Sequence, residues 1–364
     1  MRRPRKVILL TEDMGIGGQE KVIATLAGGL DRRRFEVEVW CLARGGALAD
    51  ELARSGVRVR VLGLASYHDP FQVVRLSRHL RRAGANIVHA HGSFAGTFGR
   101  LSALLAGKPK TLLHVHSTEP GLRLRHIAVQ RLLFPFTDAV VCVSMAVRRF
   151  MTVALGLSAR KCRVVYNGIP DVMPTRPVFA AQPKKAAGLL VVSLGSLVEN
   201  KGHRVLLAAF RRAAGTRPDL HLMIVGGGPL RAALERQAKE LGLGDRIRFA
   251  GFLADVEPVL SRADMVIQPT LYREALSLAL IEAARHGLPA VASRLGSIPE
   301  VVDHGRTGLL VPPGDAEALA EAIGRLAAEP SLRERLGNAA RIEYERRFRA
   351  ERMIAAIEAL YDSL

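Results

Sequence analysis

Short runs of apolar residues alternate with longer amphipathic segments along the first half of the chain. The runs are continuous in Val, Ile and Leu, a pattern typical of strands buried on both faces of a parallel sheet. Segments such as 19–30 and 71–83 carry apolar residues at three-to-four spacing, so we expect them to be crossover helices. The predicted strands are residues 6–10, 35–41, 57–62, 86–89, 110–115, 139–143 and 162–166.

This alternation stops in a proline-rich segment and then starts again. Residues 167–183 show no hydrophobic periodicity and indicate a linker. Further predicted strands are residues 189–194, 221–225, 247–249, 265–267, 290–292 and 308–311. The fold class is therefore α/β, with two Rossmann-like, doubly wound parallel-sheet domains that would bind ligands in a cleft beyond their strand ends. The predicted parts are an N-terminal domain (1–170), a linker (171–186), a second domain (187–342) and a closing helix (343–364).

Composition agrees with a folded protein. The 364 residues are 49% hydrophobic, enough for two cores. The basic start is followed by too few apolar residues for a signal peptide, and no stretch has membrane-spanning length, so we expect a cytoplasmic protein. Cys41, Cys142 and Cys162 are odd in number and scattered, which favours buried thiols in a reducing compartment.

Positive charge is concentrated in the first half of the chain. Residues 1–170 contain 27 Lys and Arg against 11 Asp and Glu, a net of +16, whereas the rest has a net of +3. Such asymmetry favours a polyanion or an anionic membrane surface, and an Arg-rich genome would not explain it. Nucleic acid is disfavoured because aromatic residues are only 5% and no stacking motif is present. The candidate membrane surfaces, which could equally be solvated helix faces, are residues 71–82 (Arg75, Arg78, Arg81, Arg82) and 122–134 (Arg123, Arg125, Arg131).

Two features at predicted strand ends of the first domain could contact a ligand. Gly15, Gly17 and Gly18 precede a helix and could admit a phosphate, or simply connect strand to helix, and they do not form the dinucleotide fingerprint. Four histidines form two alternating pairs, for which a metal site must be considered. Third and fourth ligands have no obvious source for either pair, so packing within the sheet is the alternative, and His116 is the preferred functional residue. The pairs are His89 with His91 and His114 with His116.

In the second domain, Lys201 is predicted at a helix start, where a cation opposes the helix dipole unless an anion is bound. A second loop contains three glycines ending in Gly228, followed by Pro229, which suits a first helical turn. These features favour contact with a phosphate group.

A third motif of this domain carries two carboxylates. Glu274 is in the loop, Ser277 is a plausible helix N-cap, and Glu282 lies in an apolar helix where a charge needs a partner such as a ligand hydroxyl. Backbone amides of residues 276–278 could hold a diphosphate, with Glu282 accepting hydrogen bonds from ribose and Glu274 from a transferred sugar.

These motifs, in this order, resemble those of retaining glycosyltransferases of the GT-B fold, in family 4. The resemblance covers nearly the whole chain, and its most specific part is the pair of glutamates separated by seven residues. The matching motifs are Gly17-Gly18-Gln19-Glu20, residues 87–91, His116, residues 143–144, Asn167-Gly168-Ile169, Lys201-Gly202, residues 226–229, residues 249–251, Glu274 with Glu282, and residues 308–315.

The resemblance implies specific roles. Glu282 would hold the ribose, Glu274 the donor sugar and Lys201 the diphosphate, while the Gly17-Gly18 loop would close over the phosphates and His116 would contact the reacting sugar. The remaining implied donor contacts are Ser196, Gly228, Leu276, Ser277 and Leu278. The resemblance further implies a UDP- or GDP-linked donor and no metal or other cofactor, and the chain has no Asp-x-Asp element.

The implied acceptor is a glycan or a lipid-linked molecule, in cell-surface polysaccharide or glycolipid biosynthesis. Family members bind it mainly on the N-terminal domain, and their last helix usually crosses back to that domain. Docking at the inner membrane face would bring a lipid-linked acceptor within reach.

Two departures from the family pattern affect the phosphate contacts. Ser196 stands where many relatives carry Arg, and Ala275-Leu276-Ser277 replaces a glycine-containing turn. The alternatives are a GT-B sugar-nucleotide epimerase, whose usual N-terminal motif is absent, and a non-catalytic protein that binds nucleotide sugars or anionic membranes. Donor base, sugar, acceptor and oligomeric state are not encoded in these motifs.

Overall fold

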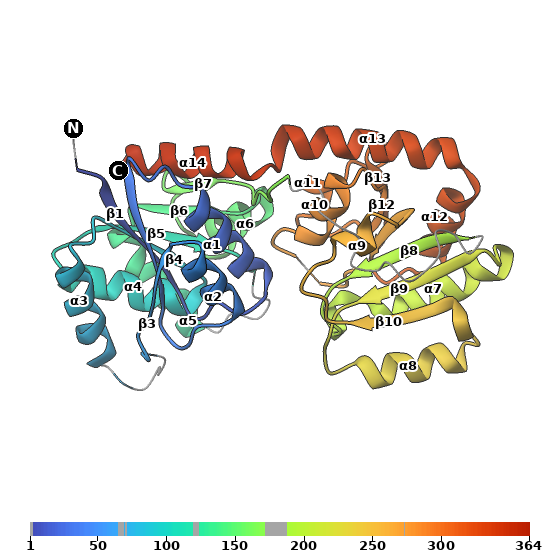
Figure 1. The fold of residues 1–364 in the computed structure, drawn as a ribbon, viewed down its shortest axis with the longest axis horizontal. Coiled ribbons are helices and arrows are strands. Elements are labelled where there is room, and N and C mark those ends of the chain that lie inside the picture. Colours follow the sequence, from blue (N-terminus) through green and yellow to red (C-terminus); the bar gives the residue numbers. More distant parts are fainter. Residues whose placement is uncertain (1–2, 65–68, 70, 119–123, 172–187, 273) are drawn as a thin grey trace. The chain divides into compact units, whose positions relative to one another are not determined.

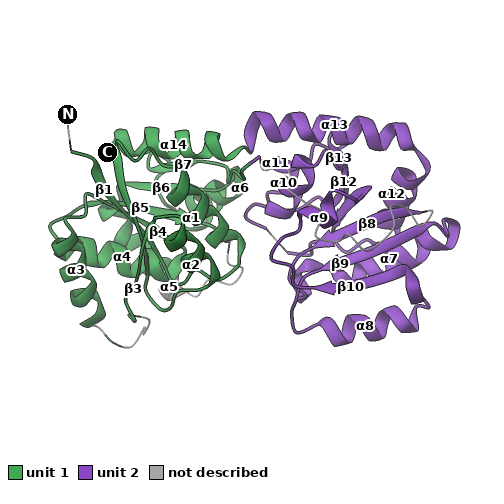
Figure 2. Ribbon diagram, viewed as in Figure 1, with its two compact units in different colours: residues 1–170, 349–364 green, residues 171–348 purple. Residues whose placement is uncertain are grey.

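The computed structural model describes residues 3–64, 69, 71–118, 124–171, 188–272 and 274–364, with the side chains of 124–126 left aside. The chain divides into two compact units, residues 1–170 with 349–364 and residues 171–348 (Figure 2). The predicted linker falls almost entirely on residues 172–187, outside the described residues. No helix within the described ranges is long and apolar enough to cross a membrane.

Unit 1 is built on a seven-stranded parallel sheet of order β3-β2-β1-β4-β5-β6-β7 (Figure 1). Its strands are β1 (Arg5–Thr11), β2 (Phe35–Cys41), β3 (Arg58–Val61), β4 (Ile87–His91), β5 (Lys110–Val115), β6 (Ala139–Cys142) and β7 (Cys162–Val164). Its α-helices are α1 (Gly18–Gly29), α2 (Ala47–Arg54), α3 (Phe71–Ala83), α4 (Ser93–Leu105), α5 (Leu124–Leu133), α6 (Met145–Arg149) and α14 (Ala350–Asp362).

Unit 2 contains a six-stranded parallel sheet of order β10-β9-β8-β11-β12-β13. Its strands are β8 (Leu189–Leu194), β9 (Leu220–Val225), β10 (Ile247–Gly251), β11 (Met265–Gln268), β12 (Ala290–Ser293) and β13 (Gly308–Val311). Its α-helices are α7 (His203–Thr216), α8 (Arg231–Glu240), α9 (Glu257–Leu260), α10 (Leu278–Arg285), α11 (Ile298–Val301), α12 (Ala316–Ala328) and α13 (Pro330–Arg347).

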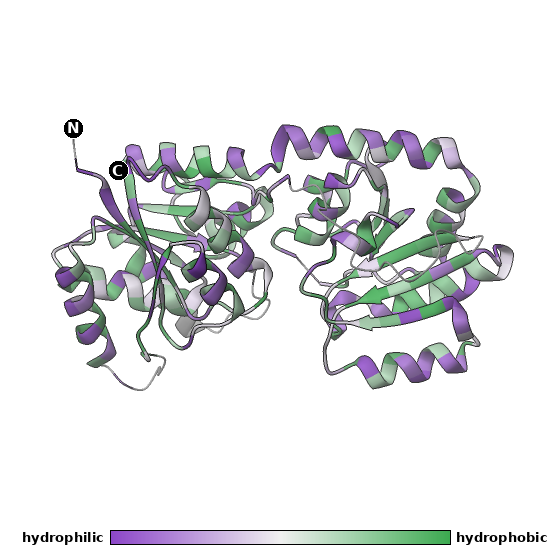
Figure 3. Cartoon of the chain, viewed as in Figure 1, coloured by the Kyte–Doolittle hydropathy of each residue, from purple (hydrophilic) through white to green (hydrophobic). Residues whose placement is uncertain are grey.

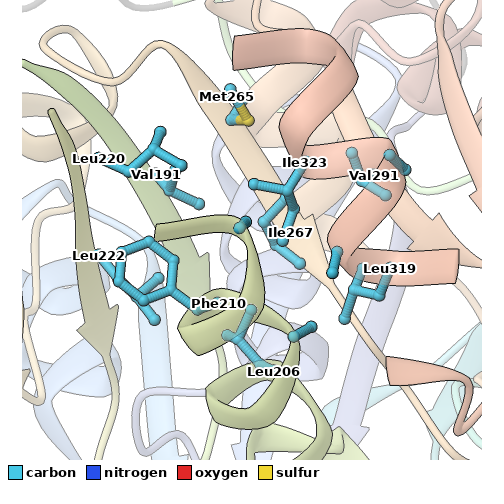
Figure 4. Packing of buried hydrophobic residues seen from close by; sticks show 14 of the residues in the cluster. Val191, Leu206, Phe210, Leu220, Leu222, Met265, Ile267, Val291, Leu319 and Ile323 are labelled. Atoms are coloured by element: carbon cyan, nitrogen blue, oxygen red, sulfur yellow. The ribbon is translucent and has the colours of Figure 1, made fainter. Parts of the chain in front are cut away.

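The strands form because helices cover both faces of each sheet. In unit 2, side chains of α7 and α12 meet strand residues such as Val191 and Ile267 in one buried cluster (Figure 4). A second cluster, containing Val192 and Val266, covers the opposite face. Strands buried on both sides need apolar residues at every position, which explains their continuous hydrophobic runs (Figure 3).

The last helix, α14, belongs to unit 1. Tyr361 is fully buried, its ring edge packs against Phe35 at 5.4 Å between ring centroids, and its hydroxyl lies 2.7 Å from Nδ1 of His89. Glu358 accepts a hydrogen bond of 2.8 Å from the amide of Asp31. The C-terminal helix therefore packs on the sheet of unit 1, although it follows unit 2 in the sequence.

All thirteen predicted strands are present, with ends shifted by at most two residues. The two doubly wound parallel sheets confirm the predicted fold class. Cys41, Cys142 and Cys162 are buried free thiols, as expected.

Two glycines inside helices of unit 2 differ in their surroundings. A Cβ added at Gly337 of α13 would lie 2.1 Å from the carbonyl oxygen of Gly287, whereas one at Gly324 of α12 would meet nothing within 4 Å. We predict that Gly337→Ala lowers the free energy of unfolding by about 1–3 kcal/mol through overpacking. Gly324→Ala should raise it by about 0.5–1 kcal/mol because alanine favours the helix. Urea unfolding of both variants measures these changes. If the two substitutions changed the free energy of unfolding equally, the prediction would be wrong.

Candidate functional site

In each unit the distinctive loops flank the point where the strand order reverses. Unit 1 reverses between β1 and β4, and unit 2 between β8 and β11. At such a reversal the connections after the two adjacent strands run to opposite faces of the sheet. Open α/β sheets bind their ligands at the carboxyl ends of these two strands. The predicted site residues fall into one group in each unit, and each group is described by itself.

Glu274, in the loop after β11, is the centre of a polar network in unit 2. Its Oε1 accepts a hydrogen bond of 2.7 Å from Nζ of Lys201. Its Oε2 accepts a short bond from Nε2 of Gln268 and one of 3.2 Å from Oγ1 of Thr270. The backbone carbonyl of Glu274 is held by Ser297, whose hydroxyl donates over 2.9 Å. One carboxylate oxygen is therefore fixed by neutral donors, and the other is paired with a cation.

Lys201 does not begin a helix, contrary to the sequence prediction. It ends a short 3₁₀ turn, and α7 starts two residues later, after Gly202. Gly202 has φ +70°, and an added Cβ would lie 1.9 Å from the carbonyl oxygen of Pro269. This close approach of the two loops brings Lys201 to Glu274, 73 residues away in sequence. The dipole argument for an anion at Lys201 is therefore replaced by direct ion pairing.

The glycine loop after β9 packs against the loop after β8. Gly228 has φ +155°, and an added Cβ would lie 2.7 Å from the amide nitrogen of Leu197. The carbonyl of the neighbouring Ser196 accepts from Nε2 of His203 at 3.3 Å, with His203 neutral because burial lowers its pKa to about 4. Pro229 precedes α8 rather than lying in its first turn. Backbone is thus packed directly on backbone beside Lys201.

Ser277 caps α10 as predicted, its Oγ accepting from the amide of Leu280 at 3.3 Å. Its hydroxyl also donates to Gln268, which ties the cap to the Glu274 network. Leu276 is buried and Leu278 half-buried at this helix start. Glu282 lies in an apolar helix, as predicted, and is half-buried, four residues after Leu278 on the same partly exposed helix face.

In unit 1, the glycine loop after β1 lies beside the end of β4. Gly17 is the N-cap of α1, which begins at Gly18, and its φ of −151° is ordinary extended backbone. The side chain of Gln19, the second residue of α1, lies close to Gly92 after β4. A Cβ added at Gly92 would be 2.9 Å from Oε1 of Gln19. Gly92 has φ +78°, so a side chain there would also be strained.

The two histidine pairs form one cluster instead of two. Nδ1 of His91 lies 3.0 Å from Nε2 of His116, and the rings of His114 and His116 are 4.1 Å apart. His116 is half-buried as a residue, but its Nδ1 is buried without a hydrogen-bond partner in the described chain. Desolvation lowers the pKa of His116 to about 3, so its ring is neutral near pH 7.

A pocket in unit 1 opens beside this cluster. Polar side chains of its lining include His114, His116, Ser93, Ser117 and Gln130, and Phe150 and Met151 provide apolar surface. A neutral imidazole with a ring nitrogen in such a place can donate to, or accept from, a bound hydroxyl group.

Sequence reasoning missed several polar residues of both groups. Gln268 is the last residue of β11 and Thr270 lies two residues beyond it, so polar residues at the end of an apolar run were the available signal. Tyr361 gave no such signal, because its contact with His89 spans 272 residues.

Comparison with solved structures supports the architecture. The structure of HepE from Anabaena in complex with UDP superposes with a TM-score of 0.86 at 22% identity, covering 99% of this chain and 100% of that one. A sucrose-phosphate synthase from Thermosynechococcus elongatus gives a TM-score of 0.80 at 21% identity, covering 99% of this chain and 98% of that one. The fold, with its two doubly wound parallel sheets, is that of a GT-B glycosyltransferase.

Sequence comparison identifies the family. Residues 16–171 match the model of Glycosyltransferase Family 4, and residues 176–343 match that of Glycosyl transferases group 1. The chain therefore belongs to the family 4, group 1 glycosyltransferases.

Two relatives show the range of this similarity. The GDP-mannose-dependent alpha-(1-6)-phosphatidylinositol monomannoside mannosyltransferase of Mycolicibacterium smegmatis is 29% identical over 362 residues, covering 92% of both chains. An exopolysaccharide phosphotransferase of Streptomyces coelicolor is 31% identical over 72% of this chain, which spans only 28% of that protein.

We predict that Gln268→Met lowers the free energy of unfolding by about 1–3 kcal/mol, because Ser277 and Glu274 lose a buried partner. Gln237→Met is the control, since Nε2 of Gln237 makes one exposed hydrogen bond to a backbone carbonyl and its buried Oε1 has no partner to lose in the described chain. The control should not lower the free energy of unfolding by more than about 0.5 kcal/mol. Chemical denaturation provides both values, and an unchanged Gln268→Met would show that the network does not stabilise unit 2.

Proposed function

We propose that this protein is a retaining, metal-independent glycosyltransferase that transfers a sugar from a UDP- or GDP-linked donor to a glycan or lipid-linked acceptor. The observation that carries the proposal is the contact between Lys201 and Glu274 beside the switch point of unit 2. Support for the donor classes comes from a relative named for GDP-mannose and a structural neighbour in complex with UDP. Cell-surface polysaccharide or glycolipid biosynthesis is the proposed context.

The two oxygens of Glu274 suggest how a donor would bind. A diphosphate would compete for the ammonium group of Lys201, which would release Oε1 of Glu274. Oε2 would remain held by Gln268 and Thr270, so the carboxylate would keep its position while Oε1 accepted a hydrogen bond from a sugar hydroxyl. Glu282, half-buried on α10, would accept hydrogen bonds from the ribose.

Bond cleavage requires stabilisation of the negative charge that develops on the leaving diphosphate. Lys201 would provide this charge, together with the backbone amides at the start of α10, around Leu276–Leu278, and those of the loops at Ser196 and Gly228. In unit 1, the Gly17-Gly18 loop would contact the phosphates, and neutral His116 would hydrogen-bond a hydroxyl of the reacting sugar. Attack from the face that the diphosphate leaves would retain the anomeric configuration, with a phosphate oxygen accepting the acceptor's proton.

We predict that Lys201→Ala reduces kcat/KM for the nucleotide sugar on the order of 100-fold, the usual cost of removing one charge-stabilising group. The measurement is a screen of UDP- and GDP-sugars by thermal shift, followed by transfer or hydrolysis kinetics with the hit. Lys239→Ala, which removes an exposed lysine at the end of α8, is the control and should leave the kinetics unchanged. Unchanged donor affinity and turnover in Lys201→Ala would refute the assignment, and formation of an epimer from donor alone would refute transfer.

We further propose that unit 1 docks on an anionic membrane surface to reach a lipid-linked acceptor. The face of α3 supports this, because Phe71 is 68% exposed and lies on the same helix as exposed Arg75, Arg78 and Arg82. An exposed aromatic residue among basic ones suits a helix lying in the interface. The second predicted surface, 122–134, includes Arg123 and Arg125, which lie outside the described side chains.

We predict salt-sensitive sedimentation of the protein with anionic vesicles. Changing Arg75, Arg78 and Arg82 together to Ala should weaken binding on the order of 100-fold, since each basic residue near the surface contributes about 1 kcal/mol. Changing Arg211, Arg236 and Arg248 of unit 2 to Ala alters the net charge equally and should have little effect. Equal binding to neutral vesicles would rule out the electrostatic account.

A further inference from the structure

Three histidines of unit 1 converge inside the protein. His91 and His114 are register partners on β4 and β5, and His89 precedes His91 by two residues, so all three lie on the same side of the sheet. Each is at most 1% exposed. One ring nitrogen from each residue lies within 4.8 Å of those of the other two. Ligand atoms from two neighbouring strands are therefore gathered at one buried point.

Most of these ring nitrogens have no partner in the described part of the chain. Nε2 of His89, Nε2 of His91 and both nitrogens of His114 are buried without a hydrogen bond. A buried polar atom left unpaired destabilises the fold, and the large majority of buried side-chain polar atoms have a hydrogen-bond partner. His114 must carry a hydrogen on at least one ring nitrogen, so packing alone cannot satisfy it. Four such atoms in one place indicate a bound group.

The two nitrogens that do have partners match the surroundings of metal-bound histidine. Nδ1 of His89 lies 2.7 Å from the hydroxyl of Tyr361, and Nδ1 of His91 lies 3.0 Å from Nε2 of His116. With the hydrogen on Nδ1, both rings donate outward and keep the Nε2 lone pair available for a metal ion. Metal-bound histidines generally donate their second ring N–H in this way.

We propose that His89, His91 and His114 bind one divalent transition-metal ion of the zinc class. Imidazole nitrogens suit Zn²⁺, Co²⁺, Ni²⁺ and Cu²⁺, whereas Mg²⁺ and Ca²⁺ prefer oxygen ligands, which this set lacks. Zn–N bonds of about 2.1 Å place tetrahedral ligand atoms about 3.4 Å apart. The rings of His89 and His114 are stacked, with 6° between their planes, so on binding the side chains must turn as well as draw together by up to about 1.4 Å. The fourth position suits a water molecule entering from the pocket that His114 lines.

Such an ion would have a structural effect in unit 1. It would join the ends of β4 and β5 and, through His91, fix the ring orientation of His116. Through His89 it would also fix the end of α14 by way of Tyr361. The ion would take no part in stabilising the diphosphate, which the proposed function assigns to Lys201 in unit 2.

The test is cobalt binding by the untagged, full-length protein after EDTA treatment and dialysis. We expect one Co²⁺ per chain, with visible absorption bands of a four-coordinate ion that Zn²⁺ displaces. His114→Gln removes a ligand from a side chain that makes no hydrogen bond in the described chain, and should weaken affinity on the order of 100-fold or more. Tyr361→Phe keeps all three ligands but removes an outer partner, and should weaken affinity about 10–100-fold.

His221→Gln in unit 2 is the matched control and should bind Co²⁺ like the parent. Circular dichroism establishes that every variant is folded. Absence of Co²⁺ uptake by the parent, or equal uptake by folded His114→Gln, would overturn the proposed site. Because these measurements use no nucleotide sugar, their failure would leave the proposed transferase activity untouched, and a failure of the transfer assay would leave the metal site untouched.

Discussion

The need to bury both faces of a parallel sheet determines the arrangement of this protein. Each sheet grows in both directions from one central strand, β1 in unit 1 and β8 in unit 2, because crossover helices must cover both sides. The reversal opens a crevice at the carboxyl ends of adjacent strands. The glycine loop and the β4 end in unit 1, and Lys201 and Glu274 in unit 2, all lie at these reversals. Their position follows from the winding of the chain.

Close contact between the backbones of neighbouring loops positions the polar groups of unit 2. Gly202 lets the loop after β8 contact Pro269, and Gly228 lets the loop after β9 contact Leu197. A side chain at either position would collide with the facing backbone and force these loops apart. The pairing of Lys201 with Glu274 thus depends on glycine as much as on charge, because a fixed ion pair needs fixed loops.

In unit 1 the sheet carries polar rings where a strand interior is normally apolar. His89, His91 and His114 occupy inward positions and are neutral because burial lowers the pKa of each of these rings. Burying such a cluster of rings destabilises the fold unless the ring nitrogens have hydrogen-bond partners or bind a ligand. Tyr361 and His116 use two of them, which links the C-terminal helix to the residue proposed to contact the reacting sugar.

The sequence alone determined the strands, the fold class and the Ser277 cap, because burial on two faces and helix capping act over neighbouring residues. It placed Lys201 at the start of a helix, whereas the residue ends the 3₁₀ turn before α7, because the exact start of a helix depends on how the neighbouring loops pack. Only the tertiary structure decided that Lys201 meets Glu274, that two histidine pairs form one cluster, and that Tyr361 reaches His89. The physical reason is that strand register and loop packing join residues tens to hundreds of positions apart, and hydrophobic periodicity carries no information about such contacts.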